Sequence, residues 1–113
     1  MLKFYKLNDS IIFDKKDLNL EKVEIKETDA GEKHVPQVTI NQNIVEVVVG
    51  TNLHPMTPEH YIEYIVLETD KGYYVKITKD LKEARCKHCL ENDEKLLAVY
   101  SYCNLHGVYK NTL

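Results

Sequence analysis

Residues 61–78, YIEYIVLETDKGYYVKIT, hold two runs of β-branched and aromatic residues with a turn sequence between them. The runs cover 61–69 and 73–78, and the intervening Asp70-Lys71-Gly72 is typical of a turn that connects strands. Runs of the same kind recur at 37–40, 43–49 and 96–103. Several short strands separated by turns are typical of a β-sandwich or a barrel, so we expect an all-β fold.

Two segments depart from this strand pattern. Residues 79–90, KDLKEARCKHCL, have helix-forming content with Asp80 as a candidate N-cap, and we consider a short helix there. Residues 1–30 suggest one pair of strands, at 4–12 and 20–25. Many charged side chains lie between these two strands and after the second one. We interpret residues 1–30 as an N-terminal arm that packs on a main domain formed by 31–113.

Length and composition are those of an ordinary globular domain. The chain has 113 residues, 43% hydrophobic and 29% charged, which fits one domain with one core. A net charge of −3 with both signs spread along the chain argues against nucleic acid as the main partner, because binding phosphates needs a basic surplus. No apolar run approaches the roughly 20 residues of a membrane span, and no secretory signal is visible. Three cysteines, an odd count, suit a reducing cytoplasm, where clustered thiols bind metals or do chemistry.

Four short motifs contain all five histidines and all three cysteines. These motifs are Glu32–Pro36, His54–His60, Cys86–Cys89 and Cys103–Gly107. His54 and His60 are six residues apart, and the two prolines between them forbid a regular helix, which excludes the helical zinc geometry of metalloproteases. Two histidines on a proline-stiffened loop can still converge on one metal ion. A single helical turn starting at Thr57–Pro58 is one way to present His60.

The last motif adds a thiolate to these imidazoles. Cys103 ends an apolar strand and His106 follows three residues later, so one loop can direct both side chains to the same point. A thiolate with imidazoles suits zinc, copper or iron. Four histidines and one cysteine are too many for a tetrahedral structural zinc site and differ from the two-histidine, one-cysteine set of blue copper. Five protein ligands leave one octahedral position open for a small ligand, and an opposing thiolate increases the electron density at the metal.

The motifs EKHVP, HPMTPEHYIEYI and YCNLHG closely resemble those of the superoxide reductases, also called the desulfoferrodoxin and neelaredoxin family. The resemblance covers about residues 29–113. It implies an immunoglobulin-like, seven-stranded antiparallel β-sandwich that holds one mononuclear non-haem iron per chain. The ligands that it implies are His34, His54, His60 and His106 in the equatorial plane and Cys103 in the axial position.

The resemblance also implies that Glu32 and Lys33 are catalytic. The glutamate would bind the ferric iron at the sixth position, and the lysine would attract superoxide and help to organise its protonation. A cation beside an exposed metal does concentrate a small anion. The implied activity is one-electron reduction of superoxide to hydrogen peroxide in the cytoplasm, with re-reduction by an external donor such as rubredoxin. We also expect a homo-oligomer.

Two features depart from the family pattern. Many members carry a small N-terminal domain that binds a second iron through four cysteines, whereas residues 1–30 contain no cysteine. We therefore interpret this arm as a degenerate remnant of that domain and expect no second iron. The other feature is Cys86-Lys87-His88-Cys89, which is half of a metal site. Free thiols, a reversible disulfide and a metal shared between two chains, with or without His88, are its three interpretations.

Two other functions are compatible with the same residues. One is a non-catalytic His/Cys metal-binding module of immunoglobulin-like fold, in which the metal fastens the loops together. The other is an immunoglobulin-like interaction domain without a working site. A coloured oxidised protein would support the enzyme, and a colourless zinc-loaded protein would support the module.

Overall fold

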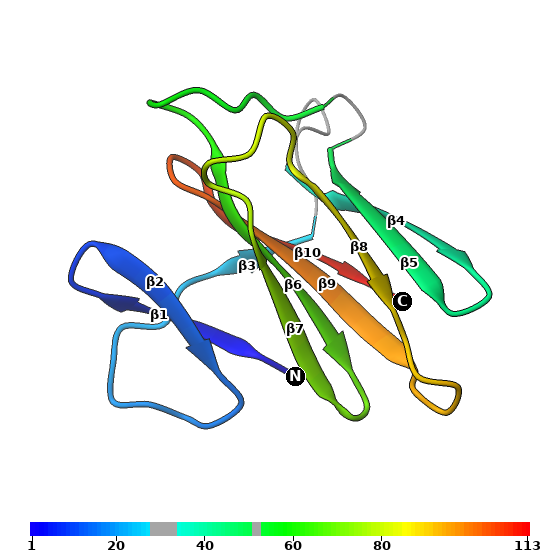
Figure 1. The fold of residues 1–113 in the computed structure, drawn as a ribbon. Helices are drawn as coiled ribbons and strands as arrows, with labels where there is room; N and C mark the ends of the chain where they lie inside the picture. The colour runs from blue at the N-terminus through cyan, green and yellow to red at the C-terminus, as the bar shows by residue number, and fades with distance from the viewer. Residues whose placement is uncertain (28–33, 51–52) are drawn as a thin grey trace.

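The computed structural model describes residues 1–27, 34–50 and 53–113 as strands joined by turns and irregular segments (Figure 1). The strands are β1 (Lys3–Leu7), β2 (Ser10–Asp14), β3 (Ile25–Lys26), β4 (Pro36–Asn41), β5 (Ile44–Val49), β6 (Ile62–Thr69), β7 (Gly72–Ile77), β8 (Arg85–Cys89), β9 (Leu96–Cys103) and β10 (Gly107–Thr112). No helix long and apolar enough to cross a membrane occurs in the described part of the chain.

The strands form two packed sheets and a separate hairpin. One sheet has the order β3-β10-β9-β6-β7 and the other has the order β4-β5-β8, while β1 and β2 pair only with each other. Neighbouring strands are antiparallel except β3 and β10, which are parallel. The predicted β-sandwich is confirmed, and β4 to β10 supply the seven strands expected of it. Strand β3 and the β1-β2 hairpin are additions to this frame.

The core between the two sheets follows from alternating apolar residues on the facing strands. Val45 and Val47 of β5 are fully buried, whereas Glu46 between them is exposed. They belong to one cluster with Ile65 of β6 and Cys103 of β9. Each buried Val or Ile stabilises the fold by about 1.5–3 kcal/mol relative to an exposed one. Because Cys103 ends β9, this core extends to one end of the sandwich.

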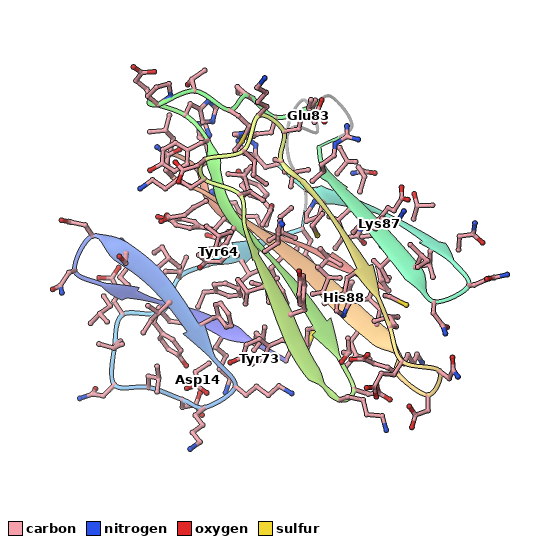
Figure 2. All side chains as sticks on the ribbon, viewed as in Figure 1. Asp14, Tyr64, Tyr73, Glu83, Lys87 and His88 are labelled. Carbon is pink, nitrogen blue, oxygen red and sulfur yellow. The ribbon has the colours of Figure 1, made fainter. Side chains whose placement is uncertain are left out.

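The β1-β2 hairpin covers the outer face of the five-stranded sheet and closes a second apolar cluster there (Figure 1). The ring centroid of Phe4 lies 5.1 Å from that of Tyr100 in β9. The Tyr64 hydroxyl donates a hydrogen bond to the Ile11 carbonyl oxygen at 2.9 Å, and Figure 2 shows Tyr64 between the hairpin and the sheet. The N-terminal arm is therefore packed on the sandwich. Its origin as a remnant of an iron-binding domain stays a prediction.

The short helix considered for residues 79–90 is wrong. The end of this segment forms β8, and the preceding residues form turns and bends. Strand β8 pairs with β5, placing Cys86 opposite Val47 and burying Ala84 and Cys86 in the main core. This long-range pairing and burial outweigh the helix-forming content of the local sequence.

The predicted pairing of residues 4–12 with 20–25 is also wrong in its main part. Residues 4–12 do not form one strand, because the chain reverses at Asn8, whose φ of 56° is one that asparagine tolerates better than most residues. The result is the β1-β2 hairpin, with Leu7 opposite Ser10. Residues 20–25 contact β1 at an isolated bridge between Tyr5 and Lys22, which two backbone hydrogen bonds flank, rather than as a paired strand.

Candidate metal centre

One end of the sandwich brings together the segments that carry the five predicted ligand residues (Figure 1). In the antiparallel registers, β4 begins where β5 ends, and β6 and β10 begin where β9 ends. The predicted ligands lie just before β4 (His34), in the β5–β6 loop (His54 and His60), at the last residue of β9 (Cys103) and in the β9–β10 turn (His106). Residues far apart in the sequence therefore meet because the strand ends meet.

Four of these residues form a compact group of metal-ligating atoms. One ligand atom from each of His34, His54, His60 and Cys103 lies within 4.8 Å of the others. Two nitrogens bound at about 2.1 Å to opposite sides of one ion would be about 4.2 Å apart, so the group has the size of a single-ion site. His106 lies beside it, with Nδ1 at 3.0 Å from Nε2 of His34 and 3.6 Å from Sγ of Cys103.

His54 shows most directly that the group fits a cation. Its Nδ1 lies 2.7 Å from the Pro55 carbonyl oxygen, which can only accept, so Nδ1 carries the proton and Nε2 carries the lone pair. That Nε2 is buried with no hydrogen-bond partner in the described part of the chain. Burial lowers the pKa of His54 to about 4, and the neighbouring imidazoles act in the same direction. A neutral, buried, inward-facing lone pair is a ready metal ligand.

The loop that carries His54 and His60 is closed by a short turn rather than by a helical one. Thr57 N–H donates to the His60 carbonyl oxygen at 2.9 Å, and His60 N–H donates to the Thr57 hydroxyl oxygen at 3.1 Å. The single helical turn considered at Thr57–Pro58 is not formed, since residues 58–60 are bends. The reciprocal bonds between Thr57 and His60 fix the backbone of His60 instead.

The β9–β10 turn holds Cys103 and His106 together. Cys103 is fully buried and lies opposite Gly107, so three residues complete the turn. Gly107 has a φ of 89°, a left-handed conformation that favours glycine because it lacks a Cβ. The geometry explains why a glycine follows His106 directly.

Asn104 fastens this turn to the loop of His60, a role that the sequence reasoning missed. Its side-chain oxygen accepts a hydrogen bond from Tyr61 N–H at 2.9 Å, and its side-chain nitrogen donates to the Glu59 carbonyl oxygen at 2.9 Å. The two contacts bracket His60. The available signal was the position of Asn104 inside the motif, directly after Cys103.

Two further residues hold His34 and were also missed. The buried Ser101 hydroxyl donates to the His34 carbonyl oxygen at 2.7 Å. The Tyr109 ring stacks on the His34 ring, with 4.7 Å between centroids and 17° between planes. Neither residue lies in a recognisable motif, so sequence spacing carries no signal for them.

Among the described residues, Cys86, His88 and Cys89 do not belong to this cluster. Glu32 and Lys33 lie outside the described residues, and their roles stay predictions.

Cys86 and Cys89 are three apart on β8, which directs their side chains to opposite faces. Cys86 is buried, which raises the pKa of its thiol to about 11, and Cys89 is exposed. This arrangement opposes a disulfide or a metal held by both thiols of one chain. His88 stacks on Tyr74 of β7, with 4.2 Å between the ring centroids.

Similarity to known proteins covers both the sequence and the fold. The sequence model of the family described as Desulfoferrodoxin matches residues 26–112. The chain is 43% identical over 93 residues to a desulfoferrodoxin of Clostridium acetobutylicum, which covers 80% of this chain and 71% of that protein. It is 35% identical over 98 residues to a superoxide reductase of Thermococcus kodakarensis, covering 72% and 85%. The crystal structure of the superoxide reductase from Treponema pallidum matches it with a TM-score of 0.88 at 31% identity, covering 99% of this chain and 98% of that one. The chain therefore belongs to the desulfoferrodoxin family.

Proposed function

We propose that the chain is a superoxide reductase, an oxidoreductase that reduces superoxide to hydrogen peroxide at one mononuclear non-haem iron. The proposed ligands are His34, His54, His60, His106 and Cys103. The convergence of four of these residues within 4.8 Å, with His106 in contact with two of them, carries the proposal. Relatives named superoxide reductase in both the sequence and the structure comparisons support it.

The protein side of the site suits this reaction. A ferrous ion held by this donor set would supply the single electron that superoxide accepts, together with two protons, to give hydrogen peroxide. Cys103 is fully buried, and with a metal bound it would provide a soft thiolate ligand shielded from water. His106 is exposed, so a small anion can approach the cluster from its side. His54 stays neutral at physiological pH because its burial disfavours the imidazolium.

Glu32 and Lys33 are the two remaining residues to which we assign a role in the proposed reaction. The proposed role of Lys33 is to attract the superoxide anion and to help deliver a proton. Glu32 would bind the ferric iron, because a carboxylate is a hard ligand that suits the higher charge. Their position two residues and one residue before His34 supports these roles. Replacement of Lys33 by alanine should slow the second-order reaction with superoxide about ten-fold at low ionic strength and leave the iron content unchanged.

The setting of the reaction is part of the proposal. An external donor, either rubredoxin or a similar small redox protein, returns the iron to the ferrous state in the cytoplasm. The chain acts as an assembly of more than one copy. Size-exclusion chromatography with light scattering tests the assembly, and reduction of the oxidised protein by candidate donors tests the electron source.

Metal content and optical spectra in both oxidation states test the proposed site. We expect one iron per chain, a nearly colourless ferrous form and a visible thiolate-to-iron band on oxidation. Cys103→Ser should remove that band, because a hydroxyl is a poor replacement for a soft thiolate. A protein that takes up only zinc would instead be the non-catalytic metal-binding module, and a Cys103→Ser variant that keeps both colour and activity would overturn the ligand assignment.

A further inference from the structure

Lys26 makes a defined contact with the turn that carries His106. It lies on β3, opposite Tyr109 in the parallel pairing with β10. Its Nζ donates a hydrogen bond to the backbone carbonyl oxygen of His106 at 3.1 Å. This lysine stands outside the motifs that carry the family resemblance, so no site role has been assigned to it.

The same ammonium group reaches a second proposed ligand through an aromatic ring. Nζ of Lys26 lies 5.3 Å from the centroid of the Tyr109 ring, within cation–π range. The Tyr109 ring in turn stacks on the His34 ring, with 4.7 Å between the ring centroids and 17° between the ring planes. Lys26, Tyr109 and His34 therefore form one continuous stack that leads from β3 to the metal-ligating cluster.

The charge of Lys26 is held in place rather than free to move. Its side chain is half-buried, and its two contacts fix the direction of the ammonium group. In the described part of the chain no carboxylate forms an ion pair with it. A fixed positive charge beside a metal centre favours the state with the extra electron, because reduction lowers the positive charge of the centre.

We propose that Lys26 is a positioning residue of the metal centre that also raises its reduction potential. It fixes the His106 carbonyl and the Tyr109–His34 stack, and its charge stabilises the ferrous state. The inference rests on the iron of the proposed function, but it does not depend on reaction with superoxide. The reduction potential is therefore a test that stands even if the activity assay fails.

Two substitutions separate the charge from the hydrogen bond. Lys26→Met keeps most of the apolar stem and loses both, whereas Lys26→Gln keeps a hydrogen-bond donor and loses only the charge. The matched control is Lys110→Met. Lys110 follows Tyr109 in the chain, and the Lys110 side chain contacts Glu27 and Met1 instead of a proposed ligand residue. Lys26→Arg preserves the charge and should keep the reduction potential of the parent.

The measurement is a redox titration of the iron-loaded protein, followed by its visible band. At a fixed applied potential near the parent midpoint, Lys26→Met and Lys26→Gln should each lower the ratio of ferrous to ferric protein about five-fold, or about 40 mV for a one-electron couple. Lys110→Met and Lys26→Arg should change it less than two-fold. Should Lys26→Met fail to fold, Lys26→Gln decides. A parent-like ratio in Lys26→Gln, or an equal shift in Lys110→Met, would overturn the proposal.

Discussion

Replacing Asn104 with alanine should separate the two loops that carry His60 and Cys103. The substitution removes two side-chain hydrogen bonds of 2.9 Å, one from Tyr61 N–H and one to the Glu59 carbonyl oxygen. At about 1 kcal/mol net for each bond, the free energy of unfolding of the metal-free chain should fall by about 2 kcal/mol. Because these bonds bracket His60, the bound iron should also be released faster to a chelator.

Urea denaturation and chelator-driven iron release measure the two effects. Asn111→Ala is the matched control, because it removes one side-chain bond of 2.9 Å, to the Pro36 carbonyl oxygen, and leaves both contacts of Asn104 with the loop of His60 in place. The control should lose about 1 kcal/mol and release iron at the parent rate. Asn104→Asp keeps the acceptor for Tyr61 N–H, so its free energy of unfolding and its rate of iron release should lie between those of the parent and of Asn104→Ala. A loss below about 0.5 kcal/mol in Asn104→Ala, with parent-like iron release, would refute the reasoning.

Three further outcomes follow from the two thiols of β8 and from Gly107 in the β9–β10 turn. Cys89 should react with a thiol reagent at pH 8 well before Cys86, as mass spectrometry of the labelled chain would show, and equal labelling would contradict the burial of Cys86. Burial raises the pKa of Cys86 to about 11, above its unfolded value. The thiol therefore stabilises the fold below about pH 8.5, and this contribution is lost as the pH rises to 11. In urea titrations, Cys86→Ala should reduce this fall of the free energy of unfolding with pH. Gly107→Ala places a side chain at a φ of 89° and should lower the free energy of unfolding by about 1–2 kcal/mol, with parent-like stability as the contrary result.

The strand pattern and the convergence of the candidate ligand residues could be predicted from the sequence. Residues 61–78 alternate and turn as two antiparallel strands do, and they form β6 and β7 with Thr69 opposite Gly72. The five predicted ligands meet because their motifs lie at strand ends, and strand ends of one sandwich meet at a common edge. Such features can be predicted from the sequence because strand periodicity and turn-forming residues act within a few residues of one another.

Other features depend on contacts that no local pattern contains. Strand β8 forms because β5 pairs with it and the core covers Cys86, although its sequence has helix-forming content. The contacts of Asn104 with the Glu59–Tyr61 backbone and of Lys26 with His106 join segments tens of residues apart. Such side chains acquire a role only when the strands have brought the segments together.

The most direct test of the superoxide reductase assignment is the product ratio of a single turnover. Ferrous-loaded protein is mixed anaerobically with less than one equivalent of superoxide, and hydrogen peroxide, dioxygen and ferric protein are measured. We predict one hydrogen peroxide and one ferric centre for each superoxide consumed, with no dioxygen released. Zinc-loaded protein is the control and should leave only the spontaneous decay of superoxide. Release of dioxygen in equal amount to hydrogen peroxide, or decay no faster than with the zinc-loaded protein, would contradict the assignment.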